Sequence, residues 1–512
     1  MSISPDFESF SRGYAAGEPQ ILTTRLIADL ETPVAAYLKL AVGRENTFLY
    51  ESVQGGEVRG RYSIIGRDPD LIWRLKDGKA EIARPLEASG GTFVAAPDAA
   101  DPLASMRALV RATRLKLPAG LPPMAAGLFG TLGYDIVRLV EHLPNVPPDK
   151  LGVPDATLLR PTLTAIFDTV RDEILLSAPV WPDAALSARD AYMRASATLQ
   201  AAIADLEKSV PASPTLTAGA LDALLDGGDI ASNTTKAEYF DIVARAKDYI
   251  MAGDIFQVVP SQRFRRPFAL PPMALYRALR RLNPSPYLYH VSLPGYAVVG
   301  SSPEILVRLK DGVVTIRPIA GTRPRGKTAE EDEKLAIELM NDPKERAEHL
   351  MLIDLGRNDV GRIAKIGDVK VTKSFFIERY SHVMHLVSDV EGHLREGLDA
   401  VDALAAGLPA GTLTGAPKIR AMEIIDEFEK EKRGGAYAGA VGYFAADGSM
   451  DMCIMLRTAL VKDGTMYVQA GGGIVADSVP ELEYQETVNK SKALMAAADE
   501  AIRLAREKMQ LH

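Results

Sequence analysis

The stretch LVRLKDGVVTIRPIAG, residues 306–321, contains two apolar runs separated by an Asp-Gly pair. Asp-Gly is a preferred pair in the tight turn of a β-hairpin, because both residues tolerate the positive φ angles that such a turn requires. Further Asp-Gly pairs lie between strand-like runs at residues 77–78, 447–448 and 463–464. The sequence therefore predicts antiparallel hairpins in an α+β fold, rather than the crossover connections of a parallel sheet.

Outward from these hairpins the chain divides into parts of different pattern. Residues 34–86 alternate short apolar and polar runs, which predicts strands joined by turns. Residues 182–210 have helical periodicity, and the following residues mix Pro, Gly, Ser and Asp as in an exposed connection. We predict an N-terminal β-rich region at residues 20–210, a linker at 211–234 and a C-terminal catalytic region at 235–508.

Composition limits the classes of function. The chain has 512 residues, a net charge of -8 and one cysteine, Cys453. A negative chain without a basic surface argues against nucleic-acid binding, so an anionic substrate requires a locally positive pocket. A single cysteine excludes an internal disulfide, and neither a signal peptide nor a membrane-spanning run is evident, so we expect a cytoplasmic protein that makes no membrane contact.

Two helices have sequence signals at their starts. Thr235 with Glu238 forms a capping box pattern, in which each side chain binds the backbone of the other residue. Ser478 with Glu481 has the same spacing and predicts a helix from about residue 479 to about residue 508. On this second helix, the spacing of Glu483, Glu486 and Lys490 places two acids and a base along one stripe.

A second E-x-x-E pattern, Glu345 and Glu348, precedes residues 350–353, LMLI, which we expect to be buried. A carboxylate near a buried surface must meet a cation, a proton or water. Two acidic pairs that face each other would offer oxygen ligands to Mg²⁺. Taken alone, each pair is more often a solvated helix face.

Seven motifs occur in the C-terminal region in this order: PIAGTRPRG, EHLMLIDLGRNDVGRI, YSHVMHLVS, GTLTGAPKIRAMEII, GAVGYF, CIMLRTAL and VQAGGGIVADSVPELEYQETVNK. Together they resemble the chorismate-utilising enzymes, and most closely the branch that forms anthranilate. The resemblance is dense over residues 235–506 and thinner at LYESVQGGEVRGRYSIIG, residues 49–66. It implies large antiparallel β-sheets packed as a sandwich with helices outside.

The resemblance also implies a metal site and a substrate site. Glu348 and Glu486 would bind Mg²⁺ directly, with Glu345 and Glu483 in support through water. The ring carboxylate of chorismate would meet the metal, Lys490 and the backbone N–H groups of Gly471, Gly472 and Gly473. The other carboxylate would meet Arg457 and Tyr437, although an ion pair on a sheet face is the ordinary role of such an arginine.

Further positions match the catalytic residues of the family. Glu304 would be the general acid that protonates the departing C4 hydroxyl, with Thr412 positioning that hydroxyl. A general acid at neutral pH requires a raised pKa, which burial can supply. His385 would assist the loss of pyruvate, although a histidine among apolar residues is more often a core residue.

Two positions separate the reactions within the family. Gln257 stands where water-using members have a lysine base, so ammonia is the expected nucleophile. Ala320 stands where aminodeoxychorismate synthases have a lysine, and Gly321 and Thr322 beside it would contact the substrate. The implied reaction is Mg²⁺-dependent formation of anthranilate and pyruvate from chorismate, the first step from chorismate toward tryptophan.

The resemblance implies two partners besides chorismate. Cys453 does not match a glutaminase nucleophile, so ammonia is expected from glutamine through a separate amidotransferase subunit, in a hetero-oligomer. L-tryptophan is expected as a feedback inhibitor, in a pocket whose residues would be Glu51, Ser52, Pro286, Tyr287, Val441, Gly442 and Tyr443. Two alternatives remain: an aminodeoxychorismate synthase, and a catalytically silent regulatory subunit that binds an amino acid.

Overall fold

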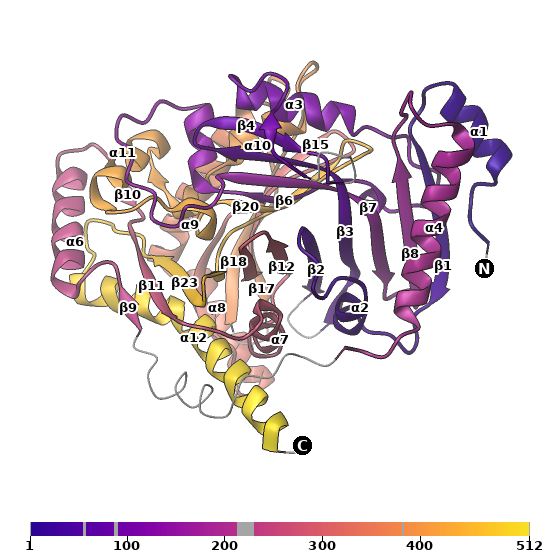
Figure 1. Cartoon of the computed structure of the whole chain (residues 1–512). Coiled ribbons are helices and arrows are strands. Elements are labelled where there is room, and N and C mark those ends of the chain that lie inside the picture. Colours follow the sequence, from indigo (N-terminus) through magenta and orange to yellow (C-terminus); the bar gives the residue numbers. More distant parts are fainter. Residues whose placement is uncertain (1, 55–57, 86–90, 212–229, 381–382, 511–512) are drawn as a thin grey trace.

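The computed structural model describes residues 2–54, 58–85, 91–211, 230–380 and 383–510 (Figure 1). Most of the predicted linker at 211–234 therefore lies outside the described residues. Within these ranges no helix is both long enough and apolar enough to cross a lipid bilayer.

The described residues form both helices and strands in large numbers. The α-helices are α1 (Phe7–Ala15), α2 (Pro33–Leu40), α3 (Pro102–Ala112), α4 (Ala188–Leu206), α6 (Lys236–Met251), α7 (Pro272–Leu282), α8 (Ala329–Asn341), α9 (Pro343–Gly361), α10 (Ala400–Gly407), α11 (Lys418–Phe428) and α12 (Pro480–Gln510). Short 3₁₀ helices are η1 (Pro123–Ala125), η2 (Tyr134–Leu139), η3 (Gly411–Leu413) and η4 (Gly434–Ala436).

The strands of the N-terminal part are β1 (Gln20–Ile27), β2 (Thr47–Gln54), β3 (Val58–Lys76), β4 (Lys79–Ala83), β5 (Val94–Ala95), β6 (Gly127–Leu132), β7 (Ala156–Asp168) and β8 (Glu173–Val180). Those of the C-terminal part are β9 (Ala231–Ser232), β10 (Gln257–Val258), β11 (Ser261–Pro267), β12 (Tyr287–Leu293), β13 (Tyr296–Ser302), β14 (Ile305–Lys310), β15 (Val313–Ile316), β16 (Ile319–Pro324), β17 (Lys370–Arg379), β18 (Val383–His393), β19 (Gly415–Ala416), β20 (Ala440–Ala445), β21 (Met450–Ile454), β22 (Thr458–Lys462) and β23 (Thr465–Gly471).

The Asp-Gly pairs form the hairpins that the sequence predicts. Asp311 and Gly312 join β14 to β15 with φ angles of 51° and 75°, as a type I′ turn requires. Positive φ angles at both residues recur in the pairs at 77–78 and 463–464. The pair at 447–448 differs, because only Gly448 has a positive φ angle and a longer connection joins β20 to β21.

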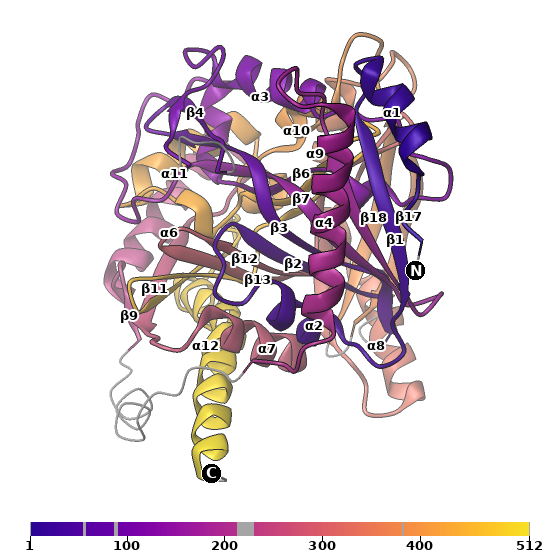
Figure 2. The same ribbon diagram turned by 45° about the vertical axis from the view of Figure 1, so that its right-hand side comes forward.

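The strands pair antiparallel throughout the described sheet, which connects 21 strands. Strand β2 pairs with β12, and β6 pairs with β20, so strands from both sides of the predicted division share hydrogen bonds. The two parts of the chain therefore build one sheet system, which folds over on itself (Figures 1 and 2).

Three apolar clusters show the layers. The middle cluster consists of side chains from strands and their connections, including Phe48, Phe129, Tyr289 and Val441. The two outer clusters each combine strands with helices: α1, α2, α4, α7 and α12 cover one face, and α3, α9, α10 and α11 cover the other. Figure 2 shows α4 crossing the outside of the sheet. The result is the predicted sandwich with helices outside.

Two local predictions are wrong. Residues 33–40 form helix α2 rather than a strand, because Thr32 caps the backbone N–H of Ala35 and Pro33 suits the first helical turn. Leu350 is 59% exposed, although its neighbours Leu352 and Ile353 are buried. Helix α9 has one face against the sheet, and Leu350 lies on the other.

Of the two predicted capping boxes, one forms and the other does not. Thr235 and Glu238 form the predicted capping box at the start of α6. At the start of α12 the predicted box is absent: the Ser478 N–H donates to the Val475 carbonyl oxygen, and Glu481 pairs with Lys236 at 2.7 Å.

Candidate active site

A cavity of about 560 Å³ lies at the junction of β16, β18, the β21–β22 connection and α12. The predicted site residues that line it are Thr322, His385, Arg457, Glu486 and Lys490. These residues come from distant parts of the sequence, and the fold of the sheet system brings them together.

Arg457 is the positive group of this cavity. It has a φ angle of 47°, which is uncommon for a residue other than glycine. Its guanidinium forms no hydrogen bond or ion pair with the residues in the described ranges, so the ordinary sheet-face ion pair is not made. Burial lowers its pKa, while Tyr380 and Glu304 raise it. A half-buried and unpaired guanidinium of this kind favours an anionic ligand.

Glu304 lies between β13 and β14, 7% exposed. Burial raises its pKa to about 8, and the Thr412 hydroxyl, Arg457 and Lys490 each lower it. The Thr412 hydroxyl donates to Glu304 Oε1 at 3.2 Å, from the 3₁₀ turn η3. The carboxyl group is therefore protonated over much of the neutral range, which is the state that a general acid requires.

His385 on β18 is buried, and burial lowers its pKa to about 4. Its Nδ1 lies 3.0 Å from the Gly321 carbonyl oxygen and 3.1 Å from Thr322 Oγ1. Because Nδ1 donates its hydrogen to the carbonyl, Nε2 carries none and can accept a proton. Nε2 is buried without a partner among the described residues. His385 is thus a neutral acceptor beside the cavity.

Gln257 on β10 is 5% exposed, and its Oε1 is buried without a partner in the described structure. Its amide abuts Gly473 so closely that a side chain on Gly473 would clash with it.

The glycine loop after β23 is partly engaged within the protein. Lys490 Nζ donates to the Gly471 carbonyl oxygen at 2.9 Å, and the Gly472 N–H donates to the Pro260 carbonyl oxygen at 3.3 Å. The Gly473 N–H has no acceptor among the described residues. The Tyr437 hydroxyl hydrogen-bonds with the backbone of Gly471, and burial raises its pKa.

Helices α9 and α12 bring four carboxylates close together, here called the acid edge: Glu345, Glu348, Glu483 and Glu486, of which Glu486 lines the cavity. Burial and the charges of Glu345 and Glu486 raise the pKa of Glu348, so the two helices lie close together. Burial and the charge of Glu486 also raise the pKa of Glu483.

The members of the acid edge differ in their partners. Glu345 accepts from Arg323 at 3.1 Å, and Glu486 pairs with Lys490 at 2.7 Å. Glu348 has no ion-pair partner in the described ranges. No group of three or more His, Cys, Asp or Glu residues in those ranges is arranged to hold a metal ion. Glu348 and Glu486 are the pair that could hold a divalent cation together with water and ligand oxygens.

The PIAGT segment approaches the acid edge through a glycine. Gly321 has a φ angle of 62°, and a Cβ at this position would lie 2.9 Å from Glu345 Oε2. The positive φ angle favours glycine here, and a side chain would also have to displace the ends of Glu345 and Leu339. Ala320 is buried on β16, opposite Leu386.

A second cavity, of about 510 Å³, contains all the residues predicted for the amino-acid pocket, namely Glu51, Ser52, Pro286, Tyr287, Val441, Gly442 and Tyr443. The Glu51 carboxylate accepts two hydrogen bonds from Arg280, at 2.7 and 3.0 Å, and one from Tyr276. Pro303 and Tyr380 line both cavities. The wall between the two cavities is therefore one residue thick at these positions.

Sequence reasoning missed several residues that contact the site. Tyr380 packs its ring against His385, with centroids 5.4 Å apart, and Tyr239 places an unpartnered buried hydroxyl near Glu483. Arg433 is buried beside Tyr437. A buried arginine leaves little signal in one sequence, because most arginines are exposed.

Comparisons with known proteins identify the family of this chain. The chorismate binding enzyme family matches residues 46–496. Anthranilate synthase component 1 of Cereibacter sphaeroides is 57% identical over 500 residues, which covers 98% of both chains. The crystal structure of anthranilate synthase component I from Streptococcus pneumoniae is 37% identical and has a TM-score of 0.73, with coverage of 92% of this chain and 99% of that chain.

A more distant structure shares the fold alone. The menaquinone-specific isochorismate synthase of Escherichia coli is 20% identical with a TM-score of 0.68, and covers 96% of this chain and 98% of its own. The family match, the sequence identity and the fold agree. The chain belongs to the chorismate binding enzymes, in the branch of the anthranilate synthase component 1 proteins.

Proposed function

We propose that this protein converts chorismate and ammonia to anthranilate, pyruvate and water, as the large subunit of an anthranilate synthase in tryptophan biosynthesis. The observation that carries the proposal is Arg457, an unpaired guanidinium in a cavity of about 560 Å³ beside a carboxyl group whose pKa is about 8. Chorismate is a dianion, so its site requires a positive group. Its reaction also requires a general acid.

The cavity offers a place for each carboxylate. Arg457 is a planar donor fork, which suits the carboxylate of the enolpyruvyl group, and the Tyr437 hydroxyl would be the second donor to it. Lys490 and the free N–H of Gly473 would bind the ring carboxylate on the side of the acid edge. Two fixed carboxylate contacts define the orientation of the ring between them.

Glu304 would donate its proton to the C4 hydroxyl, which leaves as water when ammonia attacks C2. Thr412 holds the carboxyl group from the side of η3. In the second step the C2 proton is removed, the bond to the enolpyruvyl oxygen breaks, and the ring becomes aromatic as pyruvate leaves. His385 is neutral, and its Nε2 has no partner among the described residues, so it would be the base of that step.

The acid edge fits a divalent cation, because Glu348 has no ion-pair partner within the described residues and the neighbouring carboxylates oppose its charge. Glu348 and Glu486 would hold Mg²⁺, with Glu345 and Glu483 hydrogen-bonded to its water. When bound, Mg²⁺ supplies the positive charge that lets the ring carboxylate lie among these acids.

Ammonia would come from a separate glutaminase subunit. Cys453, the one cysteine of the chain, is 1% exposed on β21, and burial raises the pKa of its thiol. A buried, protonated thiol cannot attack glutamine. The purified chain should therefore use ammonium salts and fail with glutamine.

The second cavity would bind L-tryptophan as a feedback inhibitor. The side chains of Pro303 and Tyr380 separate it from the active site, so an occupant on one side changes the packing on the other. Ser52→Phe would fill this cavity. We expect nearly unchanged basal activity and at least a tenfold weaker inhibition by tryptophan, measured as anthranilate fluorescence against tryptophan concentration. Unchanged inhibition would place the effector elsewhere.

One experiment tests the proposed reaction against its alternatives. The purified chain is incubated with chorismate, ammonium and Mg²⁺, and the products are separated. Anthranilate supports the proposal, 4-amino-4-deoxychorismate indicates an aminodeoxychorismate synthase, and no turnover indicates a silent regulatory subunit.

A further inference from the structure

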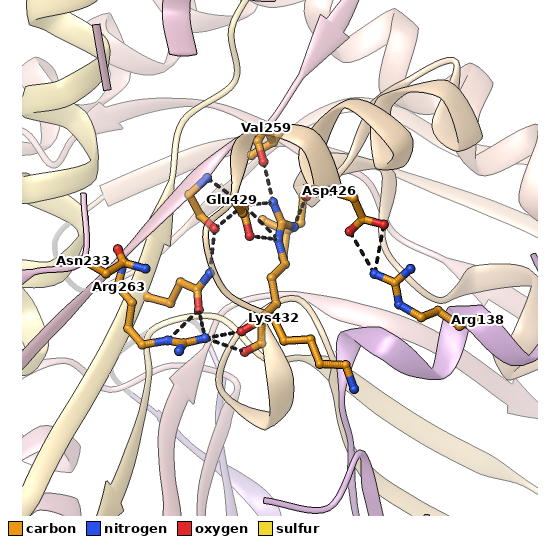
Figure 3. A network of polar contacts seen from close by, with 11 residues as sticks. Arg138, Asn233, Val259, Arg263, Asp426, Glu429 and Lys432 are labelled. Atoms are coloured by element: carbon orange, nitrogen blue, oxygen red, sulfur yellow. Dashed lines mark hydrogen bonds and ion pairs between the residues drawn. The ribbon is translucent and has the colours of Figure 1, made fainter. Parts of the chain in front are cut away.

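Arg433 is the most buried arginine beside the active site, at 2% exposure. It follows α11 and forms an ion pair with Glu429, four residues earlier in the chain, at 2.7 Å. Glu429 lies at the centre of a polar network beside Val259, with Arg263 and Lys432 close by (Figure 3). The charge of Arg433 is thus neutralised within the protein, and it lines neither of the two cavities described above.

The other donors of Arg433 bind two backbone segments that carry site residues. Nη1 donates to the Leu413 carbonyl oxygen at 2.8 Å, and Leu413 directly follows Thr412. Nη2 donates to the Val259 carbonyl oxygen at 2.7 Å, in the segment that begins with Gln257. These two segments also bind each other, because the Val259 N–H donates to the Thr414 carbonyl oxygen at 2.9 Å.

The network extends to the substrate-binding side. The Arg433 guanidinium lies 5.2 Å from the centroid of the Tyr437 ring. Its partner Glu429 accepts hydrogen bonds from both the N–H and the hydroxyl of Ser261, at 2.9 and 2.6 Å. Ser261 opens β11, which pairs with β23 at Gly471, the first residue of the glycine loop.

We propose that Arg433 is a positioning residue of the reaction, whose guanidinium fixes the turn of Thr412, the segment of Gln257 and the ring of Tyr437 in one arrangement. This inference rests on the proposed function, in which Glu304 is the general acid. A lysine cannot replace Arg433, because a single ammonium group cannot bind Glu429, Leu413 and Val259 in the plane that these acceptors share.

Loss of the Arg433 contacts is expected to change the pKa of Glu304. The Thr412 hydroxyl bond is the largest influence that lowers the pKa of Glu304, ahead of Arg457 and Lys490. Tyr380 also lies near this carboxyl group. If the turn of Thr412 loosens, this bond is lost while Arg457, Lys490 and Tyr380 remain. The pKa of Glu304 then rises, so the acid stays protonated to higher pH.

The test compares Arg433→Lys with the parent chain, using ammonium and Mg²⁺ with chorismate across pH. We expect kcat to fall about ten- to a hundredfold, more than KM changes. The alkaline limb of kcat/KM should move up by about one pH unit, since a hydrogen bond to a charged group is lost. An unmoved limb with a kcat near that of the parent overturns the proposal.

Arg160→Lys is the matched control. Arg160 is also a buried arginine, bound at 2.7 and 2.8 Å to Asp70 and 4.3 Å from the Trp181 ring, but it contacts no site segment. Arg160→Lys should lower the melting temperature without moving the limb. An equal shift of the limb in this control would show a general effect of destabilisation and would overturn the proposal.

Thr412→Val tests whether Arg433 changes the pKa of Glu304 through Thr412. This variant should move the limb on its own, and adding Arg433→Lys should move it no further. Additive shifts would overturn the role of Arg433 through Thr412. If Arg433→Lys does not fold, Glu429→Gln replaces it, because it removes the carboxylate that aims the guanidinium. A parent chain without turnover would refute the proposed function itself, which is a different result.

Discussion

The acid edge and the Arg433 network both gather charged groups from segments far apart in the sequence, yet they differ in how the charge is compensated. In the network, Arg433 has Glu429, two carbonyl oxygens and the Tyr437 ring as partners. At the acid edge, Glu348 has no ion-pair partner in the described ranges, and burial and its acidic neighbours raise its pKa. A charge that the protein neutralises serves to hold the fold, whereas one left open favours a ligand.

Arg457 belongs with the acid edge in this comparison, although its charge is positive. Both contain charge that the described residues leave open, and Arg457 lines the same cavity as Glu486 of the acid edge. We expect the open charges to govern function and the neutralised ones to govern the geometry of the site.

The largest effect is expected at Glu304. Glu304→Gln keeps the size and the Thr412 contact but removes the acidic proton, so kcat should fall by about 10³-fold. Steady-state kinetics with chorismate and ammonium measure this, and an unchanged melting temperature controls for folding. Retention of about a tenth of the parent kcat would show that another group is the acid.

Arg457→Lys should have the next largest effect. Lysine keeps the charge but loses the planar fork, so kcat/KM should fall by about 10²-fold. Arg160→Lys serves again as the control for a buried arginine. Equal losses in the two variants would mean that Arg457 acts through the fold and not on the substrate.

The pH profile gives a smaller and graded effect. The general acid must be protonated, and the pKa of Glu304 is about 8. Activity should therefore be constant below that pH and fall about tenfold for each unit above it. A limb near pH 5 instead would mean that Glu304 is ionised at neutral pH in the working enzyme.

The smallest effect concerns stability. Mg²⁺ at about 100 times its Kd should raise the melting temperature by about 2–3 °C, because it neutralises the open acids. Glu348→Gln should abolish this rise. Glu481→Gln, on helix α12 of the acid edge but paired with Lys236, should retain it. A rise that survives Glu348→Gln would move the metal away from the acid edge.

The hairpins and the ordered motifs were predictable because their signals are local. Asp-Gly turns need particular φ angles, and the angles at Asp311 and Gly312 are the expected ones. Helix α2 was missed, since a short helix with Thr32 and Pro33 at its start resembles a strand with a turn. The exposure of Leu350 was missed because an apolar run does not show which face of a helix it occupies.

The amino-acid sequence alone sufficed for the fold class, the family, five residues that line the first cavity and the seven expected in the second, because turn chemistry and ordered motifs occupy short stretches. Which charges are neutralised depended on the tertiary structure. The charge of Arg433 is neutralised because the fold places Glu429 and the Leu413 carbonyl oxygen beside it. The guanidinium of Arg457 has no such partner in the described ranges. The energy of a buried charge depends on these neighbours in space, and a single sequence does not contain their distances.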